Sequence, residues 1–215
     1  MRMMSIMRFS AIVLGLALAG SVSMAPANAQ VAPAPDKKGE WIHPPKELPK
    51  APRGDRNYNL DTLFEGLKVA PDEASAKAIE NRIWSLMLVS KSDTANLLMT
   101  RVKTAVDGEN LDLAIQLLDS IIEIKPDYVE AWNRRATLYF LKKNYGRAFG
   151  DITEVLSREP RHFGALSGLG LIMQEMGDDK TALKVYRRAL EVHPRLQRIP
   201  DIVKTLTEKI EGRPI

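Results

Sequence analysis

Apolar residues recur along most of the chain at the spacing of amphipathic helices. Stretches such as LDLAIQLLDSIIEIKP and ALKVYRRALEVHP place large apolar side chains three and four positions apart, which predicts helices with one buried face. Asn, Gly and Asp residues interrupt the pattern at KKNYGRA and EMGDDKTA and indicate short turns. The pattern therefore predicts an all-α fold built from paired helices.

Three prolines divide this helical pattern into equal lengths. Pro126, Pro160 and Pro194 are 34 residues apart, and each follows an apolar-periodic stretch. Because proline has no N–H to donate and its ring clashes with the preceding turn, a recurring proline marks a recurring helix end. A lone helical hairpin cannot bury its apolar face, so we expect the hairpins to stack on one another as an α-solenoid.

Two of these units resemble the tetratricopeptide repeat (TPR) position by position. They carry its large, small and closing proline positions, which are Trp132, Ala136, Ala148 and Pro160 in residues 129–162 and Leu166, Gly170, Ala182 and Pro194 in residues 163–196. Residues 95–128 are a weaker copy, with Val102 where a smaller residue is usual. The resemblance implies a TPR-like superhelix of antiparallel helical hairpins over residues 61–211.

The segments that flank the three units depart from the repeat pattern. Residues 57–94 form a degenerate N-terminal capping hairpin, because Pro71 interrupts the first helix and Pro71-Asp72 begins the second. Residues 197–215 contain an amphipathic stretch from Pro200 to Glu211. We expect it to be a C-terminal capping helix, followed by a short tail, that shields the last repeat from water.

The first 29 residues have the layout of a bacterial secretory signal peptide. Arg2 and Arg8 precede an uncharged stretch of twelve apolar or small residues, and the ending Ala27-Asn28-Ala29 predicts cleavage after Ala29. An uncleaved membrane anchor is the alternative, although so short a stretch does not span about 30 Å of hydrocarbon as a helix. We therefore expect a periplasmic protein with no stable membrane insertion after cleavage.

Residues 30–56 contain six prolines and few apolar residues, which predicts a disordered, extended linker. The alternative is that the segment Trp41-Ile42-His43-Pro44-Pro45 docks on the protein's own body or on a partner, as proline-rich ligands do. The sequence leaves both interpretations open.

Charge is distributed unevenly along the repeat region. Residues 57–130 carry 13 acidic and 7 basic residues, whereas residues 131–215 carry 16 basic and 10 acidic residues. The region as a whole is neutral and lacks the basic surplus of a nucleic-acid-binding domain, so we expect no nucleic-acid partner. The opposite charges of the two halves favour a weak head-to-tail self-association or the steering of a complementary partner.

The sequence offers no catalytic or metal-binding constellation. The chain has no cysteine, and His43, His162 and His193 stand apart from other donors at ligand spacing, so we predict no metal, no cofactor and no catalytic residue. His162 and His193 are expected to cover helix ends beside the closing prolines. Asp72 and Asp178 precede helices and are expected to cap them. The protein is therefore predicted not to be an enzyme.

The resemblance also implies a binding site, because the first helices of tetratricopeptide repeats line a concave groove that holds extended peptides or helices. The residues at those places are Met99, Lys103, Asn133, Arg134, Thr137, Phe140, Ser167, Leu171 and Gln174. This set lacks the lysine and asparagine pattern with which some family members grip a C-terminal carboxylate. The implied function is a non-enzymatic adaptor or scaffold for another protein of the cell envelope. The alternative is an accessory subunit of an enzyme acting on envelope polymers.

Arg101 and Arg135 stand where the repeat pattern has an apolar residue, one place before the small position. A charge buried alone is costly, so we expect these side chains to reach solvent or to pair with acids such as Asp119 or Glu123. The alternative hypothesis is that they orient an acidic partner.

Overall fold

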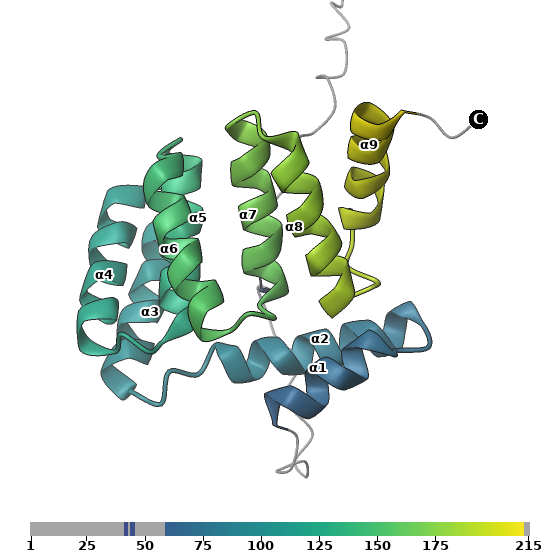
Figure 1. Ribbon diagram of the computed structural model, residues 1–215. Helices are drawn as coiled ribbons and strands as arrows, with labels where there is room; N and C mark the ends of the chain where they lie inside the picture. Colours follow the sequence, from purple (N-terminus) through teal and green to yellow (C-terminus); the bar gives the residue numbers. More distant parts are fainter. Residues whose placement is uncertain (1–40, 43, 46–58, 213–215) are drawn as a thin grey trace, which may run out of the picture. The chain divides into compact units, whose positions relative to one another are not determined.

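The computed structural model describes residues 41–42, 44–45 and 59–212, so the predicted signal peptide and most of the predicted linker lie outside the described residues. Within the described part of the chain the secondary structure consists of nine α-helices, which confirms the all-α prediction (Figure 1). They are α1 Leu60–Lys68, α2 Glu73–Met87, α3 Asp93–Asp107, α4 Leu111–Ile124, α5 Val129–Leu141, α6 Tyr145–Arg158, α7 Phe163–Glu175, α8 Asp179–Val192 and α9 Ile199–Glu211.

The central six helices pack as three antiparallel hairpins, α3–α4, α5–α6 and α7–α8, which lie side by side in chain order (Figure 1). Their boundaries repeat with the period of the sequence. The second helices begin at residues 111, 145 and 179 and end at residues 124, 158 and 192, two residues before each closing proline. The stacked hairpins therefore confirm the predicted solenoid arrangement.

The turn inside each hairpin has the same backbone geometry in all three copies. One residue adopts a positive φ, 57° at Glu109, 57° at Lys143 and 81° at Gly177. The residue that follows is the N-cap of the second helix, and its side chain accepts a hydrogen bond from the backbone N–H three positions on; these caps are Asn110, Asn144 and Asp178. Only the third turn uses glycine, the residue that adopts this conformation without a steric penalty.

Small residues let the two helices of a hairpin approach closely. A Cβ atom at Gly170 of α7 would lie 2.4 Å from the ring of Tyr186 of α8, so this position admits no larger residue without a shift. Ala136 and Ala148 fill the equivalent places between α5 and α6 and are fully buried.

The α1–α2 hairpin contacts the start of α7 and the segment after α8. The Trp84 ring packs edge-on against Phe163, with 5.0 Å between ring centroids, and Nε2 of His193 lies 3.3 Å from Oε2 of Glu80. Arg195 donates hydrogen bonds to the carbonyl oxygens of Ala70 and Pro71. At nine residues, α1 is shorter than the 13-residue first helices α5 and α7, so this hairpin does not match a full repeat. It lies across the ends of the later helices, where Figure 1 shows α1 and α2 beneath α7 and α8.

The helix α9 packs against α8 at the other end of the array. Ile199 and Leu206 are buried there, and Arg187 of α8 donates hydrogen bonds to Thr207 and Glu211 of α9. The apolar stripe read in the sequence at residues 200–211 thus faces the last repeat.

Candidate functional site

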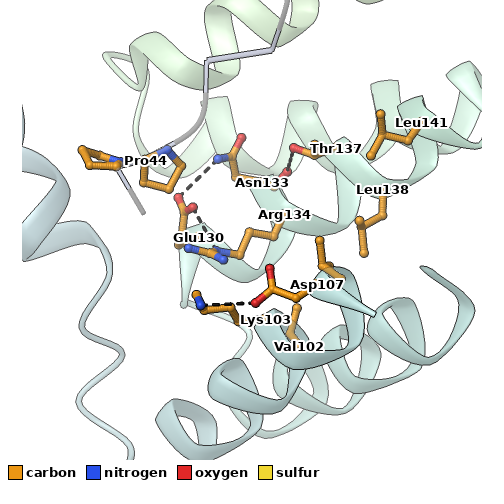
Figure 2. Close-up of a pocket in the computed structure, with 12 residues that line it drawn as sticks. Pro44, Val102, Lys103, Asp107, Glu130, Asn133, Arg134, Thr137, Leu138 and Leu141 are labelled. Atoms are coloured by element: carbon orange, nitrogen blue, oxygen red, sulfur yellow. Dashed lines mark hydrogen bonds and ion pairs between the residues drawn. The ribbon is translucent and has the colours of Figure 1, made fainter. Parts of the chain in front are cut away.

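An opening of about 330 Å³ lies between the first helices α3 and α5 (Figure 2). Its polar lining consists of Lys103, Asp107, Glu130, Asn133, Arg134 and Thr137. Its apolar lining consists of Pro44, Pro45, Val102, Val106, Leu138 and Leu141. A surface with polar groups at one end and exposed aliphatic groups at the other suits a ligand that has both a polar backbone and apolar side chains.

Glu130 is the centre of the polar end. Its side chain is fully buried. One carboxylate oxygen accepts a hydrogen bond from Nδ2 of Asn133 at 3.2 Å, and Nε of Arg134 lies 3.3 Å from the other oxygen. His162 completes the cluster from the start of α7. Its Nδ1 accepts a hydrogen bond from the N–H of Ala165, so the ring proton is on Nε2, which lies 3.4 Å from Glu130. Asn133 and His162 therefore contact one oxygen of the buried carboxylate, and the other oxygen has the Arg134 ion pair but accepts no hydrogen bond from a described residue.

Asn133 has one hydrogen-bonding atom left over. Its amide nitrogen must point to the Glu130 carboxylate, which accepts only, and this fixes the direction of the amide oxygen. Asn133 is 2% exposed, and its Oδ1 has no hydrogen-bond partner among the described residues. A buried acceptor without a partner costs about 1–3 kcal/mol, so this oxygen favours a ligand that supplies an N–H.

The formal charges around the opening cancel. Lys103 pairs with Asp107 at 3.2 Å, and Arg134 pairs with Glu130 (Figure 2). No cation of this lining is left over to hold a carboxylate. The chemistry therefore fits an uncharged peptide backbone better than a chain terminus.

Trp41, one of the few described residues ahead of α1, lies next to α5 and α7. Its ring is 5.5 Å from the ring of Phe140 of α5, and the side chain is 5% exposed. A Cβ atom at Gly168 of α7 would lie 2.3 Å from the Trp41 ring. The docking of this segment on the protein's own body, one of the two alternatives read in the sequence, is the arrangement that these residues adopt.

The structure brings four of the nine predicted groove residues together in the opening, namely Lys103, Asn133, Arg134 and Thr137. Phe140 contacts Trp41, and Met99 is half-buried against the core. Ser167 and Leu171 are buried, and the Ser167 hydroxyl donates to the carbonyl oxygen of Phe163. The Gln174 side chain accepts a hydrogen bond from Tyr186 at 2.7 Å.

Sequence reasoning missed Glu130; it included Pro44 and Pro45 in a segment with docking as one alternative, but did not predict where they would lie. Glu130 stands three and four positions before Asn133 and Arg134, so its place on the same helix face was readable from the helical period. Pro44 and Pro45 reach the opening from far outside the repeats, and no spacing rule indicates that contact.

The two unusual arginines differ in the structure. Arg135 pairs with Asp119, as expected, and also with Asp151, so its charge is satisfied within the fold. The hydrogen bonds to Asp151, followed by those to Asp119, raise the pKa of the Arg135 guanidinium above its usual value. Arg101, by contrast, is exposed.

The expected capping roles are confirmed. His162 is the N-cap of α7 and His193 the C-cap of α8, while Asp72 and Asp178 accept backbone hydrogen bonds at the starts of α2 and α8. Bonds from the Thr181 side chain and backbone lower the pKa of the Asp178 carboxyl. Within residues 59–212 and the four described residues before them, no three His, Asp or Glu side chains cluster to hold a metal ion. None of the helices described is long and apolar enough to cross a membrane.

Comparison with known proteins points to one family. The chain is 42% identical over 153 residues to a TPR repeat-containing protein of Rhizobium etli, and the alignment spans 71% of this chain and 75% of that protein. No protein-family profile matches the chain.

Solved structures of the same fold include the first TPR of Spaghetti (RPAP3) bound to an HSP90 peptide, with a TM-score of 0.53, 20% identity and coverage of 56% of this chain and 95% of that one. The Sgt2 TPR domain from Aspergillus fumigatus gives a TM-score of 0.52 at 22% identity and covers 58% of this chain and 87% of that one. At these identities the likeness shows the fold alone.

Proposed function

Because the chain belongs to the tetratricopeptide repeat proteins, we propose that it is a non-enzymatic adaptor that binds an extended segment of a partner protein between α3 and α5. The observation that carries this proposal is that Asn133 lines the opening and that its buried side-chain oxygen accepts no hydrogen bond within the described residues. An extended peptide presents backbone N–H groups at regular intervals, and one of these would satisfy that oxygen.

The apolar part of the opening sets the class of partner. Val106 and Leu141 are exposed, whereas Val102 and Leu138 of the same lining are buried. Aliphatic or aromatic side chains of the bound segment would cover these groups and gain about 25 cal/mol for each Å² of apolar surface removed from water. The RPAP3 domain, which has the same fold, is bound to a peptide of HSP90.

The proposed location is the bacterial periplasm, and the partner is a protein of the cell envelope. The support is the signal-peptide layout of residues 1–29, which lie outside the described residues. Fractionation of cells that express the chain with an epitope tag at its C-terminus tests the location. A tagged product in the cytoplasm at its full mass would contradict it.

Selection from a random-peptide phage library against the wild-type chain tests the binding function. We expect the selected peptides to bind Asn133→Ala about tenfold more weakly, because one hydrogen bond to a buried acceptor is lost. Gln116→Ala, at an exposed position of α4, is the matched control and should bind like the wild type. Equal affinity for all three chains would contradict the site.

The natural partner can then be sought with a crosslinking pull-down from the envelope fraction. The wild-type chain is compared with the double variant Asn133→Ala plus Lys103→Ala. A protein captured by the wild type and lost with the double variant is the expected result.

A further inference from the structure

The segment that contains Trp41, Ile42, Pro44 and Pro45, which we call the strap, lies against α5 and α7 and reaches the proposed groove between α3 and α5. Trp41 contacts Phe140 of α5 and Gly168 of α7. One turn earlier on α7, a Cβ atom at Gly164 would lie 3.2 Å from the carbonyl oxygen of Ile42. Pro44 and Pro45 then line the opening between α3 and α5.

The helix α7 has a slot that fits the strap. Glycine inside a helix is about 1 kcal/mol less favourable than alanine, so two glycines one turn apart need a reason. Gly170 has one within the repeat, since it makes room for Tyr186. Gly164 makes room first for Trp84 of α2, at 2.9 Å, and then for the Ile42 carbonyl oxygen of the strap. Gly168 borders the strap alone, because a side chain there would collide with the Trp41 ring. The sequence of α7 thus provides space for a chain segment from outside the repeats.

The strap fits this slot incompletely. The indole N–H of Trp41 is buried and has no hydrogen-bond partner among the described residues. An opening of about 200 Å³ remains beside Trp41 and Ile42, next to Glu80 and Leu196. The larger opening remains at the proline end. A permanent part of the core is normally packed without such gaps and with its polar groups paired.

We propose that the strap is an intramolecular ligand that occupies the slot on α7 and borders the groove until a partner segment with a large aromatic side chain displaces it. This inference rests on the proposed function, that the groove binds an extended segment. The strap is joined covalently to α1 through residues 46–58. A short tether gives an effective concentration of about millimolar, so an external ligand binds the wild-type chain more weakly than a chain whose strap cannot engage.

A peptide of residues 38–50, KGEWIHPPKELPK, labelled with fluorescein, is the probe, and its binding is followed by fluorescence anisotropy. We expect it to bind the Trp41→Ala chain at least about tenfold more tightly than the wild type, because the wild-type strap competes at high effective concentration. The same peptide with alanine in place of tryptophan should not bind. Equal binding to both chains, or binding to neither while Trp41→Ala keeps its helical circular dichroism, would overturn the proposal.

A second pair of variants locates the slot. In the Trp41→Ala chain, Gly168→Leu fills the space that the indole needs and should abolish binding of the probe. Gly150→Leu is the matched control, because Gly150 is also inside a helix and a Cβ there meets no atom within 4 Å. Unchanged binding to the Gly168→Leu chain would show that the peptide does not use this slot.

The indole N–H signals of the wild-type chain give a readout that does not require a variant to fold. Trp84 donates to Glu80 and Trp132 donates to the carbonyl oxygen of Pro126, whereas the Trp41 indole is buried without a partner. Their NMR signals should therefore be distinct. With excess unlabelled peptide, the Trp41 signal should move to the position of an exposed indole. A Trp41 signal that stays in place at millimolar peptide would make Trp41 a fixed part of the core and end the proposal.

The peptides selected from the phage library separate this inference from the function on which it rests. We expect them to bind Trp41→Ala more tightly than the wild type. Equal affinity for the two chains would be consistent with the groove function but would contradict the proposal that the strap competes for it. If neither chain yields a specific peptide, the groove function itself is wrong.

Discussion

The guanidinium of Arg135 in α5 meets the carboxylate of Asp151 in α6 through two parallel hydrogen bonds of 2.8 and 2.7 Å. Its third nitrogen reaches Asp119 of α4 at 2.7 Å, and the group lies 4.9 Å from the centroid of the Trp132 ring. One side chain therefore joins three consecutive helices. This geometry assigns Arg135 to the structure of the repeats and not to a ligand.

Arg135→Ala should lower the free energy of unfolding by about 3 kcal/mol, because it leaves the buried Asp151 without its counter-charge. Arg101→Ala, at the exposed equivalent position, is the control and should change stability by less than about 0.5 kcal/mol. Urea unfolding measures both. The affinity of the Arg135→Ala chain for groove peptides, measured below its melting temperature, should equal that of the wild type; a loss would revive a ligand-binding role for this residue.

Lys143→Gly should stabilise the protein by about 0.5–1 kcal/mol. Lys143 has a φ of 57°, a conformation that costs a residue with a Cβ roughly 1–2 kcal/mol, and the greater freedom of glycine in the unfolded chain offsets part of the gain. Thermal unfolding gives the result. The reverse change at the third turn, Gly177→Ala, should destabilise, and the same sign for both substitutions would contradict the turn geometry.

Glu80→Gln should reduce the loss of stability in acid. Burial alone would raise the pKa of the Glu80 carboxyl, but the hydrogen bonds from His193 and Lys77 outweigh it and leave the pKa below its usual value. A carboxylate with a depressed pKa contributes stability above its unfolded pKa, near about 4.3, and loses that contribution as the pH falls through the folded pKa. Urea unfolding from pH 6 downward should show a steeper decline for the wild type than for Glu80→Gln. The exposed Glu123→Gln is the control and should decline like the wild type.

Gly168→Ala should change stability with opposite signs in two backgrounds. In the wild type the new methyl group collides with Trp41 and should destabilise the protein by about 1–3 kcal/mol or detach the strap. In the Trp41→Ala chain the collision is gone, and alanine should stabilise α7 by up to about 1 kcal/mol. Thermal unfolding of the wild type, Gly168→Ala, Trp41→Ala and the double variant completes a double-mutant cycle. Additive effects on stability would show that Gly168 and Trp41 do not interact.

The opposite charges of the two halves of the repeat region predict a weak self-association that salt suppresses. Charges in solvent are screened over about 30 Å at 0.01 M salt but over about 8 Å at 0.15 M. Sedimentation velocity at these two salt concentrations should show a smaller weight-average coefficient at the higher one. Association that is insensitive to salt would exclude the electrostatic explanation.

The repeat architecture was predictable because its determinants are local. A proline, a small residue and an N-cap act on neighbours within about one 34-residue unit, so their effects recur with the unit and are visible as a period. Asn133 and Lys103 were placed in the groove by the same reasoning. Glu130 belongs to the same helix face and was within reach of it.

The contacts that bypass the repeats were not predictable in this way. Glu80 and His193 are 113 residues apart, and Trp41 reaches Gly168 from outside the array. Neither pair of residues recurs at the 34-residue period, so the repeat pattern does not indicate that they are in contact. Gly164 and Gly168 carried a signal, since glycine is unfavourable inside a helix, but the repeat pattern gives no reason to expect a tryptophan beside them.

The contacts between the α1–α2 hairpin and the segment after α8 change how the protein should unfold. Open arrays of repeats unfold first at their termini, because each repeat packs only against its immediate neighbours. Here α1 and α2 hold α7 and the end of α8 through Trp84, Glu80 and Arg195, so neither α2 nor α8 is free to unfold before the other. Amide hydrogen exchange should accordingly show α2 and α8 opening together, as a single cooperative event.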